Sequence, residues 1–168
     1  MKEIKNITIY SKENIKDFLE IYYFERIKKI RIILNILVII IIISFFINNN
    51  KSTLDIITFI FALFGLLEIN TSMIPRLNLY KLAKSKKSII NSKVTYLFKK
   101  NNFKLNQNEY IDYNTLKKVI ETKKAYYLYI NNSRSLIVDK KDMTKEEKDS
   151  LTNTLQKQVS TYINKNNV

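Results

Sequence analysis

The stretch Ile32–Ile47, which reads IILNILVIIIIISFFI, decides the fold because it contains no charged residue. Its only strongly polar member is Asn35. At about 1.5 Å per residue, a helix of this length reaches roughly 24 Å, a little short of a hydrocarbon core about 30 Å thick. Lys29 and Arg31 can extend the span by laying their aliphatic stems along the lipid. The stretch predicts a membrane-spanning helix, because the rest of the chain has too little apolar surface to cover it.

A second apolar run, Ile56–Ile74, reads IITFIFALFGLLEINTSMI. The polar segment Asn48–Asp55 separates the two runs and is short enough to be a tight connection. The two runs therefore predict an antiparallel transmembrane hairpin over residues 32–74. Pro75 is expected to end or kink the second helix.

Basic residues flank the predicted hairpin on both sides, whereas the connecting loop carries one Lys and one Asp. Cytoplasmic flanks of membrane helices are enriched in Lys and Arg. We therefore predict a multi-pass protein of the cell membrane with both termini in the cytoplasm. The same charges are expected to contact the anionic inner leaflet. On the C-terminal side they are Arg76, Lys81, Lys84, Lys86 and Lys87.

Glu68 is the only acidic residue in the predicted spans. Intramembrane carboxylates are costly and often serve ion or proton transfer. A second interpretation places Glu68 near the interface, paired with Asn35 or with Arg31 to hold the hairpin together. We prefer this structural pair, Glu68 with Asn35.

The segment before the first span, residues 1–31, predicts a strand at Ile4–Tyr10 and then a helix over Lys12–Lys29. Ser11 is in the N-cap position. Apolar residues recur at helical spacing along this helix and can rest on the membrane or pack on the C-terminal domain. We favour the domain, because acidic residues on the helix oppose tight binding to anionic lipid. Since neither Pro nor Gly intervenes, this helix can run directly into the first span.

Residues 75–90 form a basic linker, and residues 91–168 predict a small antiparallel β-sheet domain closed by one amphipathic helix. Thr144 and Glu147 have the spacing of a capping box, which predicts a final helix that runs to about Ile163. The fold class is therefore an α+β membrane protein. The β-type runs are 93–99, 103–106, 109–113, 117–122, 125–130 and 135–139.

The composition argues against an enzyme. The chain lacks His and Cys and has one Gly, so it has neither the common acid–base and metal-binding side chains nor a Gly-rich phosphate loop. No catalytic residue, cofactor or metal is predicted. The formal net charge of +14 could suggest nucleic-acid binding, but no such motif is present and a nearby anionic membrane explains the charge. The abundance of Ile, Asn and Lys indicates an AT-rich bacterial genome.

The C-terminal half contains three tracts that follow one another: Tyr110–Tyr113 with Leu116–Thr122, then Ala125–Ile130, then Ser135–Lys140 with Met143–Glu147. In these tracts it resembles YcxB-like proteins. The family plan also includes a strand, a helix rich in aromatic residues and two spans, as here. The resemblance implies a PH-like cytoplasmic domain and no assigned biochemical role. Asp139 departs from the family, which often has Pro there.

These observations predict a non-enzymatic integral membrane protein whose PH-like cytoplasmic domain binds a protein or a lipid head group. The alternative is an immunity protein against a membrane-active peptide, such as a bacteriocin, for which a small neighbouring gene would argue. Two spans could transport a solute only as an oligomer. The sequence leaves open whether the protein is a homo-oligomer.

Overall fold

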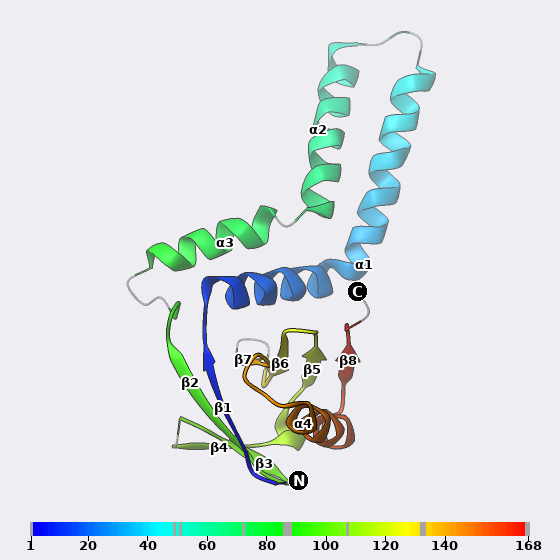
Figure 1. Cartoon of the computed structure of the whole chain (residues 1–168). Coiled ribbons are helices and arrows are strands. Elements are labelled where there is room, and N and C mark those ends of the chain that lie inside the picture. Colours follow the sequence, from blue (N-terminus) through cyan, green and yellow to red (C-terminus); the bar gives the residue numbers. More distant parts are fainter. Residues whose placement is uncertain are drawn as a thin grey trace. The chain divides into compact units, whose positions relative to one another are not determined.

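A computed structural model describes residues 2–48, 50, 52–71, 73–85, 89–106, 108–131 and 134–166. Figure 1 shows the whole chain, coloured from the N-terminus to the C-terminus. The chain divides into two compact units, Met1–Phe18 with Lys87–Val168, and Leu19–Lys86. Each unit is described by itself below.

The first unit contains a four-stranded antiparallel sheet in the order β1-β2-β3-β4. Strand β1 pairs with β2 along its full length, from Ile4 opposite Phe98 to Ile9 opposite Lys93. The N-terminal segment is thus an integral strand of this unit. The bounds are β1 Ile4–Ile9, β2 Lys93–Phe98, β3 Asn102–Leu105 and β4 Glu109–Asp112.

A second four-stranded sheet has the order β7-β6-β5-β8, and its last strand lies parallel to β5. The short 3-10 helix Tyr113–Thr115 connects β4 with this sheet. Helix α4, Lys145–Gln158, follows β7 and precedes β8. The bounds of the strands are β5 Lys118–Glu121, β6 Ala125–Tyr129, β7 Ser135–Asp139 and β8 Tyr162–Asn164.

The core of this unit lies between the sheets and α4. Four aromatic side chains are fully buried there: Tyr96, Phe98, Phe103 and Tyr113. Each ring contacts the next one in this order. Leu151 and Leu155 of α4 are fully buried beside them in the same cluster. Burial of large apolar side chains contributes about 1.5–3 kcal/mol each, so this cluster is the main source of stability.

Polar side chains of β1 join the two sheets. Strand β1 alternates buried and exposed positions, and two of its buried residues are Asn6 and Thr8. Asn6 Nδ2 donates to the carbonyl of Asp139 at 2.8 Å, and Thr8 Oγ1 accepts from the Asp139 N–H at 2.9 Å. The hydroxyl of Tyr10 accepts from the Ile137 N–H at 3.1 Å. Side chains of β1 and Tyr10 thus form hydrogen bonds with backbone N–H and C=O groups on the outer edge of β7, which would otherwise need a neighbouring strand.

Three expectations from the sequence are corrected in this unit. The strands form two sheets instead of one, and the 3-10 helix Tyr113–Thr115 separates β4 of the first sheet from β5 of the second. Residues 1–31 are not a separate segment, since Met1–Phe18 groups with the C-terminal strands. The final helix ends at Gln158 rather than near Ile163, and Tyr162–Asn164 instead pairs with the edge of β5. The predicted capping box is confirmed: Thr144 Oγ1 accepts from Glu147 N, and Glu147 Oε2 accepts from Thr144 N.

Helix α1, Lys12–Ile47, begins in the first unit and continues without a break into the second. Its first turns pack on the β unit, as expected, through the buried side chain of Ile15 and the contact of Phe18 with the rings of Tyr127 and Tyr129.

The second unit holds the apolar part of α1, then α2, Thr53–Asn70, and α3, Met73–Lys84. Helices α1 and α2 are long and apolar enough to cross a membrane, and only 6% of the apolar window of each is buried. Phe45 and Phe59 stack between them at a centroid distance of 4.2 Å. The second apolar helix is shorter than the predicted 56–74. It ends at Asn70, and Pro75 lies in the first turn of α3, where its missing N–H costs no helical hydrogen bond.

Candidate functional site

The basic residues predicted to contact lipid lie partly on α3. Arg76, Lys81 and Lys84 are exposed on this helix. Lys86 and Lys87 fall outside the described residues. The ammonium group of Lys84 lies 4.3 Å from the centroid of the Tyr80 ring, which is a cation–π contact. The sequence had left the conformation of this linker open, and the structure makes most of it a helix.

Helix α3 has two apolar faces. Pro75 and Leu79 are buried, whereas Met73, Leu77 and Tyr80 are 57%, 53% and 57% exposed. Positions 73, 77 and 80 follow the spacing i, i+4, i+7 and therefore form one stripe on the helix surface. Arg76, Lys81 and Lys84 belong to the same exposed side. An apolar stripe flanked by cations is the pattern of a helix that lies in the membrane interface.

The predicted pair between Glu68 and Asn35 is not what the structure shows, since Asn35 pairs with Asn70. The amide of Asn70 donates to Asn35 Oδ1 at 2.9 Å, and that of Asn35 donates to Asn70 Oδ1 at 3.3 Å. The cause is the early end of α2, which brings Asn70 into the last turn beside α1. Among the residues that the structure describes, Glu68 Oε1 is buried without a hydrogen-bond partner.

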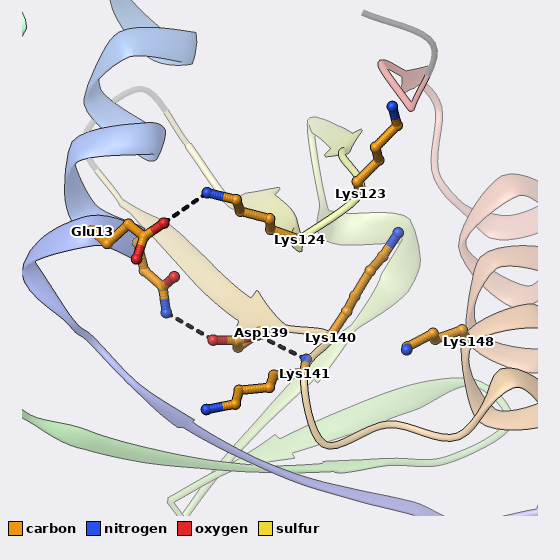
Figure 2. Close-up of a pocket in the computed structure, with 8 residues that line it drawn as sticks. Glu13, Lys123, Lys124, Asp139, Lys140, Lys141 and Lys148 are labelled. Atoms are coloured by element: carbon orange, nitrogen blue, oxygen red, sulfur yellow. Dashed lines mark hydrogen bonds and ion pairs between the residues drawn. The ribbon is translucent and has the colours of Figure 1, made fainter.

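A basic pocket of about 330 Å³ lies in the first unit (Figure 2). It was not predicted from the sequence. Four segments form it: the first turn of α1, the turn between β5 and β6, the end of β7, and α4. Its cations come from the last three segments: Lys123, Lys124, Lys140, Lys141 and Lys148. Its other lining residues are Glu13, Asn14 and Asp139.

Hydrogen bonds fix the walls of the basic pocket. The Lys140 N–H donates to the carbonyl of Lys124 at 2.8 Å and ties the end of β7 to the β5–β6 turn. Asp139 accepts from Asn14 Nδ2 at 2.9 Å through one carboxylate oxygen and from the Lys141 N–H at 2.8 Å through the other. The carboxylate of Asp139 therefore connects the first turn of α1 with the end of β7.

Two of the five lysines have acidic partners. Lys124 Nζ lies 2.7 Å from Glu13 Oε1 and 3.3 Å from Asp17 Oδ2, and these contacts raise the pKa of Lys124 and lower that of Glu13. Lys140 binds Glu121, which is not among the residues that line the pocket. In the described part of the chain, the ammonium groups of Lys123, Lys141 and Lys148 make no ion pair, and Figure 2 draws none from them to the other lining residues.

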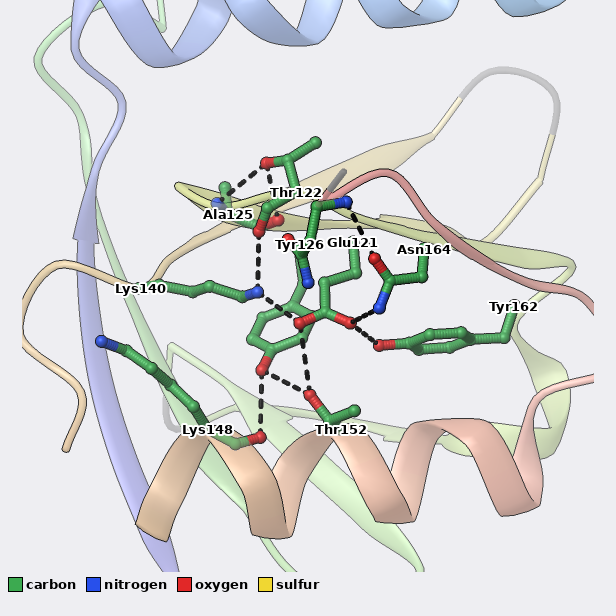
Figure 3. A network of polar contacts seen from close by, with 10 residues as sticks. Glu121, Thr122, Ala125, Tyr126, Lys140, Lys148, Thr152, Tyr162 and Asn164 are labelled. Carbon is green, nitrogen blue, oxygen red and sulfur yellow. Dashed lines mark hydrogen bonds and ion pairs between the residues drawn. The ribbon is translucent and has the colours of Figure 1, made fainter. Parts of the chain in front are cut away.

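The partner of Lys140 belongs to a buried polar network (Figure 3). Lys140 Nζ lies 2.5 Å from Glu121 Oε1, with both side chains less than 10% exposed, and it also donates to the carbonyl of Thr122 at 2.7 Å. The second carboxylate oxygen accepts from the hydroxyl of Tyr162 and from Asn164 Nδ2. Burial raises the pKa of the Glu121 carboxyl, but the hydrogen bonds from Lys140 and Tyr162 outweigh it and hold the pKa below its usual value.

This network also explains why β8 forms. Tyr162 and Asn164 reach Glu121 only if their segment lies extended beside β5. On the side of α4, the hydroxyl of Tyr126 forms a hydrogen bond of 2.8 Å with Thr152 Oγ1 and donates to the carbonyl of Lys148 at 3.1 Å. The network therefore anchors the backbone of Lys148 at the wall of the basic pocket.

A comparison with known families supports the resemblance noted above. Residues 100–155 match the model of the family described as YcxB-like protein. The match covers about a third of the chain and runs from the start of β3 into α4, so it includes all five lysines of the basic pocket. No curated protein and no solved structure matches the chain.

Proposed function

We propose that the chain is a non-enzymatic, membrane-anchored binding module of the cell membrane. The observation that carries this proposal is the pair α1 and α2, which are long, apolar and almost entirely exposed along their apolar windows. Two such helices require cover by lipid or by other protein, because exposed apolar surface of this extent is unstable in water. A compact β unit with a polar surface pocket is connected to them through α1.

The β unit supports a PH-like interpretation of this module. Strands β1 to β4 and β5 to β7 form two successive antiparallel meanders, and α4 follows them and closes the core. The family match over residues 100–155 argues in the same direction. In this interpretation the two apolar helices are an insertion between the first and second strands of the domain.

Helix α3 supports a membrane contact on the cytoplasmic side. Arg76, Lys81 and Lys84 would neutralise anionic head groups, at about 1 kcal/mol for each cation near the surface. The exposed stripe of Met73, Leu77 and Tyr80 would enter the boundary between head groups and acyl chains. The positive flanks support a topology with both termini in the cytoplasm and the α1–α2 connection outside.

The topology can be tested with single cysteines, because the chain contains none. Asn50 lies in the α1–α2 connection, and Lys157 is exposed on α4. We expect a membrane-impermeant maleimide to label Asn50→Cys on intact cells and to label Lys157→Cys only after the membrane is opened. Labelling of Lys157→Cys on intact cells, or a protein extracted from membranes by alkaline carbonate, would contradict the proposal.

A further inference from the structure

The basic pocket contains more cations than carboxylates, since five ammonium groups and two carboxylates line it. Two further acids outside the lining, Asp17 and Glu121, pair with Lys124 and Lys140. Both carboxylates of the lining already have partners, Glu13 with Lys124 and Asp139 with Asn14 and the Lys141 N–H. Lys124 and Lys140 are in ion pairs, so the lining cations without an acidic partner among the described residues are Lys123, Lys141 and Lys148.

The lining also restricts the chemistry of a ligand. All eight lining residues are charged or are Asn, and no apolar or aromatic residue is among them. Pockets for hydrophobic ligands are lined mostly by apolar and aromatic side chains, which this pocket lacks. A small group with a high density of negative charge matches it better than an acyl chain or a peptide side chain.

We propose that the basic pocket binds a phosphate-bearing ligand, with Lys123, Lys141 and Lys148 as the cations that contact its phosphate groups. A phosphate monoester carries about −1.5 to −2 charges near neutral pH, and lysine binds such groups as a point charge. The inference does not depend on the membrane topology, because every lining residue belongs to the first unit.

Hydrogen bonds to backbone groups hold the three lysine-bearing segments of the basic pocket together, which also favours binding of an anion. The three lysines come from three separate segments whose backbones are tied together: the Lys140 N–H bonds to the carbonyl of Lys124, and the Tyr126 hydroxyl bonds to that of Lys148. The charge of Lys148 also lowers the pKa of Lys140, although less than burial does, so these two ammonium groups repel each other. A bound phosphate would relieve this repulsion.

The experiment uses the full chain in nanodiscs of phosphatidylcholine, in which no lipid carries net charge. In one arm, inorganic pyrophosphate is added at constant ionic strength, with chloride as the reference salt. In the other arm, a fifth of the lipid is replaced by phosphatidic acid, which exposes a phosphate monoester at the membrane surface. Thermal unfolding of the β unit is followed by circular dichroism, since a ligand that binds the folded state raises the Tm.

We expect the Tm to rise in at least one arm, and the arm that responds identifies the source of the phosphate as soluble or lipid. The triple variant Lys123→Gln, Lys141→Gln, Lys148→Gln should bind pyrophosphate at least tenfold more weakly, or lose the response to phosphatidic acid. A variant with the same change of net charge, Lys93→Gln, Lys100→Gln, Lys157→Gln, alters exposed lysines outside the pocket and should keep the response. No rise in either arm, or an equal response in both variants, would overturn the proposal.

Discussion

The buried pair of Glu121 and Lys140 is the residue-scale feature on which the β unit most depends. Both side chains are removed from water, which costs several kcal/mol for each ion unless their remaining hydrogen-bonding groups are satisfied. The carboxylate accepts from Lys140, Tyr162 and Asn164, so its desolvation is well compensated. Removal of one partner would leave the other as an unpaired buried charge.

The substitution Glu121→Gln should therefore lower the free energy of unfolding at pH 7 by about 3–5 kcal/mol. The pKa of Glu121 is lower in the folded state than the ordinary 4.5, so the unfolded chain takes up its proton first as the pH falls. The contribution of this carboxylate is complete above about pH 4.5 and decreases below it. The difference between wild type and variant should thus shrink in acid. Urea unfolding of wild type and variant in mild detergent, at pH 7 and at a pH below about 4.5, measures this difference in the free energy of unfolding.

Glu109→Gln is the matched control, because Glu109 forms a salt bridge with Arg134 in which both side chains are 43% exposed. Solvent screens this pair, so its loss should cost at most about 1 kcal/mol. An equal effect of the two substitutions at pH 7 would show that burial does not set the strength of the Glu121 pair.

At the scale of single elements, local signals in the sequence are sufficient for most of the β unit. The strand β7 has its predicted bounds, and α4 starts at the predicted capping box. These elements depend on near neighbours, namely alternation of side chains and a cap of four residues. Strand β8 could not be predicted in this way. Tyr162 fits the helical spacing of Leu151 and Leu155. Its segment is nevertheless a strand, because it pairs with the edge of β5 and the Tyr162 hydroxyl donates to the carboxylate of Glu121.

Helix α3 gives a prediction for a single element, because the chain contains no Trp. Tyr80→Trp should show blue-shifted emission in bilayers and strong quenching by brominated phosphatidylcholine, since this side chain belongs to the stripe proposed to enter the interface. Tyr110→Trp is the matched control, because Tyr110 is 60% exposed on β4, outside that stripe. Its emission should be that of a solvated indole, with little quenching.

The charges of α3 can be tested with the same reporter. Quenching of Tyr80→Trp should increase when phosphatidylglycerol is added to the bilayer. It should lose this dependence when Arg76, Lys81 and Lys84 are changed to Gln, because each cation contributes about 1 kcal/mol near an anionic surface. Equal quenching of Trp at positions 80 and 110 would contradict a specific membrane contact by α3.

At the scale of the whole molecule, the sequence could not reveal that the β unit is discontinuous. Strand β1 finds its partner β2 only after two long apolar helices and α3 have intervened. Nothing local in Ile4–Ile9 specifies that partner. The basic pocket has the same origin, since its lysines lie in three segments and its acids in two, and only the folded sheets bring them together. Local periodicity therefore predicts elements here, whereas pairing over long distances creates the candidate site.

The discontinuity predicts which part of the chain folds alone. Residues 89–166 by themselves lack β1, so β2 would expose an unpaired edge and Asp139 would lose the hydrogen bonds from Asn6 and to Thr8. This fragment should show no cooperative unfolding. Residues 2–18 joined to 89–166 by a Gly/Ser linker should unfold cooperatively, with β-type circular dichroism. A linker of about 12 residues spans roughly 19 Å. The linker must span the part of α1 that the fusion keeps, residues 12–18, which is about 10 Å long. This helix starts close to the other end of the linker, because Tyr10 is hydrogen-bonded to Ser92 and Asn91.

Matched substitutions in β1 make this test specific. In the fusion, Ile4→Asn places an amide at a position that is 3% exposed in the core and should abolish cooperative unfolding or lower the Tm strongly. Ile9→Asn makes the same chemical change at a position that is 55% exposed, so the Tm should be almost unchanged. If the fragment 89–166 folded as stably as the fusion, or if both substitutions had the same effect, β1 would not be an integral strand of the unit. A folded fusion would show instead that the apolar helices are an insertion in an otherwise autonomous domain.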